Sequence, residues 1–220
     1  MELIVALDVD TISDAEKLIN LLKKDVKIFK VGSKLFTSVG PQIIDIINKN
    51  GCKVFLDLKY CDIPSVISSA VKIAGEKNVF AVSVHISGGK EMLEKCVCLK
   101  NRPLLWGISV LTSLDENNLK EIGISRKIDE QVEVLAKMAK ETGLDGVVCS
   151  PKEIEIIKRI GGLKIIVPGI RPAAGSDDQK RTLTPKKAKE FGADYIVVGR
   201  PIIQSDNPLS AARTILKEVL

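Results

Sequence analysis

The sequence predicts a parallel (β/α)8 barrel, the TIM-barrel class of α/β folds, formed by a single domain over residues 1–220. Eight short runs rich in valine, isoleucine and leucine alternate with amphipathic segments along the whole chain. Such runs are typical of strands covered on both faces, and eight strand-then-helix units in about 220 residues fit this barrel. A doubly wound open sheet also alternates strands with helices and is the alternative architecture. No proline- or glycine-rich linker divides the chain, which favours one domain.

The predicted strands, in chain order, cover residues 3–8, 28–32, 53–59, 79–86, 104–111, 146–150, 163–169 and 195–199. Between them, helix starts are indicated by capping boxes at Ser13 with Glu16 and Ser150 with Glu153, and by a cap followed by proline at Thr184-Pro185 and Asn207-Pro208. Glycine favours the left-handed conformation that ends helices, and it follows the helical segments at Gly51, Gly143, Gly161 and Gly192.

Composition limits the classes of partner. The net charge of +5 comes from 33 basic and 28 acidic residues mixed in sign, which does not suggest nucleic-acid binding but suits an anionic metabolite. The cysteines are odd in number and form no CxxC pair, and a single histidine cannot complete a zinc set. We therefore expect reduced thiols and no metal. No apolar run is long enough to cross a membrane and no secretory leader is visible, so we expect a cytoplasmic protein without a membrane partner.

The third predicted strand carries two opposite charges at its end. Side chains alternate along a strand, so Asp57 and Lys59 share one face while Leu56 and Leu58 point to the other. In a barrel this places both charges at the carboxyl-terminal mouth, where active sites form. Asp62 follows closely enough to join them. The alternative is a salt bridge that closes the barrel, although buried ion pairs contribute little to stability.

Two more charges end earlier strands. Asp8 closes the first predicted strand and Lys30 lies within the second, where an unpaired charge would be costly. With Asp57, Lys59 and Asp62, they would form an alternating network of acids and bases around one cavity.

The last two strands lead into segments suited to an anion. Arg171 follows the seventh strand, and Gly199 and Arg200 end the eighth, where phosphate sites in barrels often lie. Residues 170–183 could close over a substrate as a lid, or form an ordinary surface loop. His85 is open to a general-base role, but a lone histidine on an apolar strand is more often structural.

These residues resemble one family. The segment Asp57-Leu58-Lys59-Tyr60-Cys61-Asp62-Ile63-Pro64 is similar to the DxKxxDIP signature of orotidine 5′-phosphate decarboxylases. The resemblance continues, in the family's order, through Ala6-Leu7-Asp8, Phe29-Lys30-Val31-Gly32, Val84-His85-Ile86-Ser87-Gly88-Gly89, Val110-Leu111-Thr112-Ser113, Pro168-Gly169-Ile170-Arg171, Asp178-Gln179-Lys180-Arg181 and Val198-Gly199-Arg200.

The resemblance implies a cofactor-free carboxy-lyase that converts orotidine 5′-phosphate to uridine 5′-phosphate as a homodimer with shared active sites. Lys59 would donate a proton to C6 of the pyrimidine, Asp57 would lie beside the departing carboxylate, Lys30 would pair with Asp57, and Asp62 would reach the neighbouring subunit's site. The implied substrate-binding set is Asp8, Lys30, Asp57, Lys59, Asp62, Ile63, Thr112, Pro168, Arg171, Gln179, Gly199 and Arg200. Within that set, Asp8 and Lys30 would contact the ribose, Thr112 the pyrimidine region, and Arg171, Gln179, Gly199 and Arg200 the phosphate.

Two positions depart from the family's pattern, and two rival functions remain. Cys61 stands where the family often has histidine, and Val66 stands where it usually has threonine, so Val66 offers no hydroxyl to a ribose. The nearest rival is a magnesium-dependent hexulose-6-phosphate synthase or 3-keto-gulonate-6-phosphate decarboxylase, relatives that typically carry an acid at the position of Lys30. A catalytically silent barrel that binds phosphorylated metabolites is the other.

Overall fold

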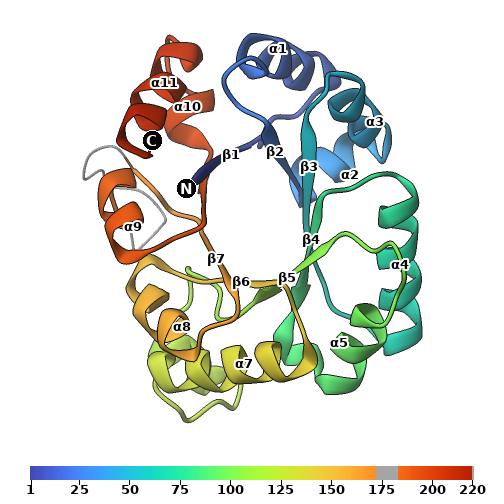
Figure 1. The fold of residues 1–220 in the computed structure, drawn as a ribbon, viewed down its shortest axis with the longest axis vertical. Helices are drawn as coiled ribbons and strands as arrows, with labels where there is room; N and C mark the ends of the chain where they lie inside the picture. Colours follow the sequence, from blue (N-terminus) through green and yellow to red (C-terminus); the bar gives the residue numbers. More distant parts are fainter. Residues whose placement is uncertain (172–182, 220) are drawn as a thin grey trace.

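The computed structural model describes residues 1–171 and 183–219, and within them the eight predicted strands form one closed parallel barrel. The strands follow one another around the barrel in sequence order, and β1 pairs with β8 to close it (Figure 1). Their bounds are β1 Glu2–Ala6, β2 Ile28–Gly32, β3 Lys53–Tyr60, β4 Ala81–His85, β5 Leu104–Ile108, β6 Gly146–Val148, β7 Lys164–Val167 and β8 Tyr195–Val198. The closure excludes the open sheet and confirms the single-domain TIM barrel.

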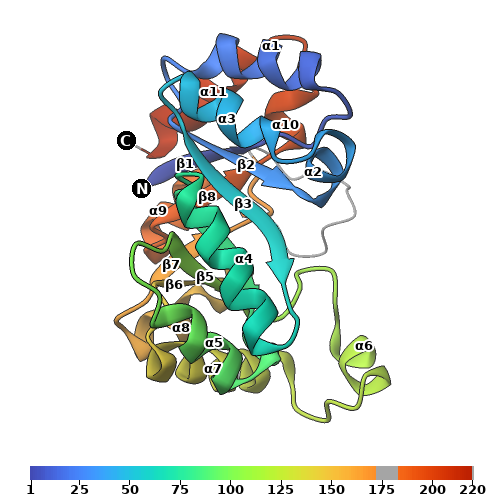
Figure 2. The ribbon, with the colours of Figure 1, turned by 90° about the vertical axis from the view of Figure 1, so that its right-hand side faces the viewer.

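The helices form a ring outside the strands (Figure 1). Their bounds are α1 Ile12–Leu22, α2 Ser33–Val39, α3 Gln42–Lys49, α4 Pro64–Glu76, α5 Lys90–Val97, α6 Glu116–Glu121, α7 Ile128–Thr142, α8 Ile154–Ile160, α9 Pro185–Phe191, α10 Arg200–Ile203 and α11 Pro208–Val219, with 3-10 turns at Ile86–Gly88 and Pro151–Glu153. Figure 2 shows that α6 projects away from this ring. Within the described residues, no helix combines the length and apolar character needed to span a membrane.

Three of the four predicted helix starts are confirmed. The Ser150 amide donates to Glu153 Oε2 at 2.8 Å, as in a capping box. The side chains of Thr184 and Asn207 each accept from the amide three residues further on, at 3.3 Å and 3.0 Å. In each case a polar side chain and its neighbouring proline satisfy or remove helix-end amides that would otherwise lack partners.

The predicted start at Ser13 with Glu16 is wrong. The N-cap is Thr11, whose Oγ1 accepts from the Asp14 amide at 3.1 Å while its hydroxyl donates to the Asp14 carboxylate at 2.7 Å. The pattern of a hydroxyl followed three residues later by an acid is therefore present two positions earlier, with aspartate as the acid. Ser13 lies inside the first turn of α1.

Several strands end earlier than predicted. The strand predicted over 104–111 ends at Ile108, and the one predicted over 3–8 ends at Ala6. Apolar composition does not mark where ladder hydrogen bonds stop, because the residues that leave the ladder can remain buried. Here two of the residues beyond the strand ends, Asp8 and Thr112, turn into the cavity described below.

The barrel interior is filled at its amino-terminal end by an aromatic cluster. Trp106 is fully buried, with its ring centroid 4.6 Å from that of Phe55, 5.0 Å from that of Tyr195 and 5.8 Å from that of Phe80. A second, larger apolar core lies between the strands and the surrounding helices. This packing leaves the carboxyl-terminal end of the barrel as the place for polar side chains.

Candidate active site

A cavity of about 250 Å³ opens at the carboxyl-terminal end of the barrel. Residues from seven of the eight strands, or from the segments that follow them, form its wall. Nine predicted site residues are among those that line it: Asp8, Lys30, Asp57, Lys59, Thr112, Pro168, Arg171, Gly199 and Arg200. Since barrel enzymes carry their active sites at this end, the cavity is the candidate active site.

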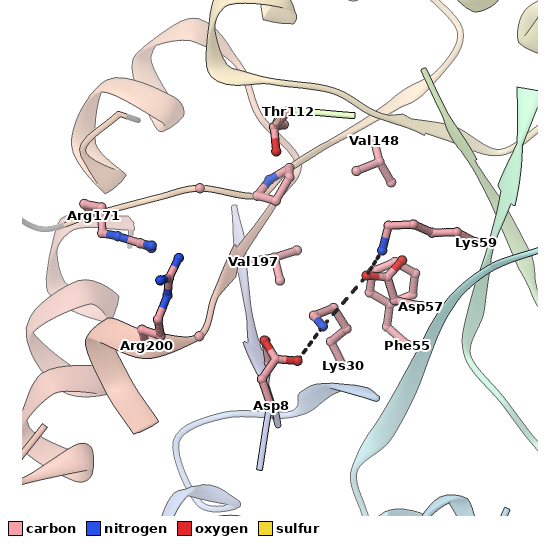
Figure 3. Close-up of a pocket in the computed structure, with 14 residues that line it drawn as sticks. Asp8, Lys30, Phe55, Asp57, Lys59, Thr112, Val148, Arg171, Val197 and Arg200 are labelled. Atoms are coloured by element: carbon pink, nitrogen blue, oxygen red, sulfur yellow. Dashed lines mark hydrogen bonds and ion pairs between the residues drawn. The ribbon is translucent and has the colours of Figure 1, made fainter. Parts of the chain in front are cut away.

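Four charged side chains on one side of the cavity form a chain of alternating sign (Figure 3). Lys30 Nζ lies 3.0 Å from Asp8 Oδ1 and 3.8 Å from Asp57 Oδ2. The same Asp57 oxygen accepts a hydrogen bond from Lys59 Nζ at 2.9 Å. The network predicted from strand ends therefore exists for these four residues, and each ammonium faces a carboxylate.

Asp57 is the buried centre of this chain. Burial alone would raise the pKa of its carboxyl, but the ammonium groups of Lys30 and Lys59 and the hydroxyl of Ser83 outweigh burial, and the pKa lies below its usual range. Ser83 on β4 donates its hydroxyl hydrogen to Asp57 Oδ1 at 2.8 Å. Asp57 therefore stays charged at neutral pH with both of its oxygens bonded.

Strand β3 departs from regular pairing where it carries these residues. Leu56 pairs with Val82 and Tyr60 pairs with Val84, so residues 57, 58 and 59 of β3 stand opposite the single residue 83 of β4. Within this bulge Lys59 has φ +52°, a left-handed backbone conformation that residues other than glycine and asparagine rarely adopt. Backbone strain of this kind clusters at functional sites. Here it accompanies an ammonium that projects into the cavity.

The other side of the cavity is suited to an anion. Figure 3 shows the guanidinium groups of Arg171 and Arg200 together, across the cavity from Lys59. Gly199 between β8 and α10 lies beside β1, since a Cβ there would be 3.4 Å from Ala6 Cβ and 3.4 Å from Asp8 Oδ2. Two guanidinium forks beside an exposed backbone segment can hold a phosphate. Of the lid predicted over residues 170–183, residues 172–182, which include Gln179, lie outside the described residues.

Sequence reasoning missed five residues of the wall: Ala6, Phe55, Val148, Gly169 and Val197. A signal for three of them was present. Ala6, Phe55 and Val197 each stand two positions before a predicted site residue on the same strand, and alternation places such pairs on one face. They form an apolar floor beneath the polar groups.

Other predicted residues lie away from this wall. Within the described part of the chain, Asp62 and Ile63 are exposed and do not line the cavity, and the Asp62 carboxylate accepts from the Ile63 amide at 2.6 Å. His85 at the end of β4 is half-buried, and its pKa is lowered first by burial and then by the positive charge of Lys59. The Asp62 carboxylate is thus separate from the charge network of its own chain.

A closed (β/α)8 barrel with a charged cavity of about 250 Å³ at its carboxyl-terminal end defines a barrel enzyme for a small anionic substrate. Residues 1–215 match the model of the Orotidine 5'-phosphate decarboxylase / HUMPS family, and the chain belongs to this family. The expected family is thereby confirmed.

Individual relatives align with this chain over nearly the whole length of both proteins. The chain is 43% identical to an orotidine 5'-phosphate decarboxylase of Trichlorobacter lovleyi, over 100% of this chain and 95% of that protein. It is 45% identical to one of Carboxydothermus hydrogenoformans, over 99% of this chain and 95% of that protein. Among solved structures, an orotidine 5'-phosphate decarboxylase of Lactobacillus acidophilus superimposes with a TM-score of 0.87 at 36% identity, covering 99% of this chain and 98% of that one.

Proposed function

We propose that this chain removes CO2 from orotidine 5′-phosphate to give uridine 5′-phosphate, the last step of de novo uridine monophosphate synthesis. The observation that carries the proposal is the chain of Asp8, Lys30, Asp57 and Lys59 on one side of the cavity, with Arg171 and Arg200 on the other. The arginines and Gly199 would hold the phosphate, with Gln179, and Asp8 and Lys30 would contact the ribose. Thr112 and Pro168 line the same cavity and would contact the base.

The chemistry assigns separate roles to Asp57 and Lys59. Heterolysis of the bond between C6 and the carboxylate releases CO2 and leaves the electron pair on C6 in the plane of the ring, where the π system cannot delocalise it. The Lys59 ammonium stabilises this charge and then transfers its proton to C6, so a C–H bond forms and the neutral amine regains a proton from solvent. Asp57, held charged and buried, would face the substrate carboxylate and oppose it in the ground state but not after CO2 forms.

The position of Lys30 argues against the magnesium-dependent relatives. Its ammonium lies between the carboxylates of Asp8 and Asp57, at 3.0 Å and 3.8 Å. A divalent cation between those carboxylates would have to displace this ammonium or accept its repulsion. The proposed reaction therefore uses no cofactor.

The proposal includes a homodimer whose subunits share their active sites. Ile63 and Val66, at the start of α4, expose 62% and 47% of their surface, and Asp62 beside them lies outside its own cavity. Exposed apolar side chains next to a carboxylate that lies outside the charge network of its own chain fit an isologous contact in which Asp62 and Ile63 complete the partner's site.

All five cysteines are unpaired, which supports a reducing, cytoplasmic location.

Two assays test these proposals. Loss of substrate absorbance should occur with orotidine 5′-phosphate in the presence of a chelator; turnover that the chelator abolishes would favour the magnesium relatives, and tight nucleotide binding without turnover would favour a silent barrel. Lys59→Ala should remove turnover yet retain uridine 5′-phosphate binding, whereas Lys137→Ala, in an exposed pair on α7, should change neither.

The shared site has its own test. Mixing Lys59→Ala with Asp62→Ala protomers should restore roughly a quarter of the wild-type rate, because random pairing makes half the dimers hybrid and each hybrid carries one intact site. No recovery, with dimers present in sedimentation, would contradict the assignment of Asp62.

A further inference from the structure

Ser83 joins the two functional parts of the β3 bulge. It is fully buried on β4 and outside the cavity wall. Its oxygen accepts a hydrogen bond from the Lys59 amide at 2.8 Å, and its hydroxyl hydrogen goes to Asp57 Oδ1 at 2.8 Å. One hydroxyl therefore connects the backbone of one of these residues to the carboxylate of the other.

The bulge explains why a side chain is needed at this point. Regular pairing would let a backbone carbonyl of β4 accept from β3, but here three residues of β3 stand opposite the single residue 83. The Lys59 amide instead bonds to the Ser83 side chain. Because a buried amide without a partner is unfavourable, this bond favours the left-handed conformation of Lys59 over competing ones.

The same hydroxyl fixes the carboxylate. Asp57 has one oxygen on Ser83 and the other on Lys59 Nζ, so the carboxylate cannot rotate without breaking a bond. The position of the Lys59 ammonium is thus restrained at two points, through the Lys59 backbone and through its hydrogen bond to Asp57.

We propose that Ser83 is a positioning residue for the decarboxylation, holding the Lys59 backbone and the Asp57 carboxylate so that the proton donor points into the cavity. This inference rests on the proposed function. Substrate contacts themselves are made by other residues, so Ser83 acts on kcat rather than on nucleotide binding.

The test compares Ser83→Ala with two matched variants. Ser83→Thr keeps the hydroxyl. Ser109→Ala removes another buried serine, on the segment after β5. Its hydroxyl donates to the Val148 carbonyl, which also accepts from the Ser109 amide. We expect Ser83→Ala to lower kcat by about 10- to 100-fold, as for loss of a charge-assisted bond that positions a reacting group, with uridine 5′-phosphate affinity within about threefold of wild type. The Ser109→Ala protein should keep a kcat within about threefold of wild type, and Ser83→Thr should regain most of the lost rate.

The pH profile separates positioning from general loss of structure. Because the Ser83 hydroxyl helps to keep the Asp57 carboxyl ionised, the acid limb of kcat should move to higher pH in Ser83→Ala and stay in place in Ser109→Ala. If Ser83→Ala does not fold, Ser83→Cys preserves the buried volume with a weaker hydrogen-bonding group and should show the same loss of kcat.

The inference is overturned if Ser83→Ala retains wild-type kcat, or if Ser83→Ala and Ser109→Ala lose activity in proportion to their loss of thermal stability. A wild-type protein without turnover would overturn the proposed function itself, which is a distinct result.

Discussion

Replacing Lys30 by methionine should destabilise the folded chain far more than replacing Lys34, although both lysines form ion pairs of 3.0 Å. Lys30 reaches Asp8 and the buried Asp57 with only 12% of its side chain exposed. Lys34 pairs with Asp10 with 52% of its side chain exposed, and Asp10 is 76% exposed. Methionine preserves most of the length and apolar stem of lysine, so the comparison isolates the charge.

The size of the loss in unfolding free energy depends on the partners that Asp57 keeps in the Lys30→Met variant. Removing one partner of a buried ion pair costs about 3–5 kcal/mol when the remaining charge has no other partner. Asp57 keeps Lys59 at 2.9 Å and the Ser83 hydroxyl at 2.8 Å, so we expect a loss nearer about 2 kcal/mol in the free energy of unfolding. That corresponds to about a 30-fold change in the ratio of folded to unfolded protein. Exposed pairs are worth about 0–1 kcal/mol, which bounds the effect of Lys34→Met.

The effect should also depend on pH. The folded-state pKa of Asp57 lies below its ordinary value of 3.8, so its ionised form contributes stability above that value, and this contribution is lost as the pH falls through the folded-state pKa. Lys30→Met raises the folded-state pKa of Asp57. The difference in unfolding free energy between wild type and variant should therefore be largest near pH 7 and should narrow only as the pH falls through the raised pKa of Asp57 in the variant.

Urea unfolding measures this, with the fluorescence of the single, fully buried Trp106 as the signal. Adding Asp57→Asn to Lys30→Met should recover part of the loss, because the unpaired charge is then gone. Equal destabilisation by Lys30→Met and Lys34→Met, or a difference that does not change with pH, would refute the argument.

Three further predictions concern the same chain. Gly32→Ala should lower kcat clearly while changing the free energy of unfolding little, because the new Cβ would lie 2.9 Å from Lys30 Nζ and push the ammonium away from its carboxylates. Steady-state kinetics and urea unfolding of one preparation test this, and an unchanged kcat would contradict it. Lys59→Gly should be at least as stable to urea as Lys59→Ala, because alanine is strained at φ +52° and glycine is not. Alanine is usually the more stable of the two in a strand, and that result here would show that residue 59 carries no backbone strain. An alkylating agent at pH 8 should modify the exposed Cys98 rapidly. The buried thiols of Cys52, Cys96 and Cys149, whose pKa values burial raises, should react only after unfolding; mass spectrometry that found these three modified as fast as Cys98 would contradict this.

The sequence was sufficient for the architecture because each strand carries its own apolar run. The sequence also predicted correctly that Asp57 and Lys59 lie together, although the backbone there is not the regular strand that the prediction assumed. Simple alternation puts both side chains on one face, whereas the structure reaches the same result through a bulge with Lys59 in a left-handed conformation. No glycine or asparagine marks that bulge locally, so only the register between β3 and β4 reveals it.

The cavity and network residues that sequence analysis missed also fall into two groups, those that local strand pattern could have identified and those that depend on pairing between strands. The apolar floor formed by Ala6, Phe55 and Val197 is a consequence of alternation and was available from the strands alone. The contact of Ser83 with Asp57 was not, because it joins side chains 26 positions apart whose meeting depends on cross-strand register. Local pattern thus determines which residues face inward, and tertiary pairing determines which of them meet.

Phe55 links the stable and the strained parts of the barrel. Its ring packs against Trp106 with centroids 4.6 Å apart and also lines the cavity, so the floor of the site is the upper layer of the aromatic core. Asp57 stands two residues further along the same strand and is therefore anchored to that core through a short, paired stretch of β3. An electrostatic site acts on a developing charge only if its groups do not reorient when the charge appears. The strained, charged end of β3 lies directly above the buried, ring-packed Phe55, and this packing opposes a shift of the strand that would relax the strain at Lys59.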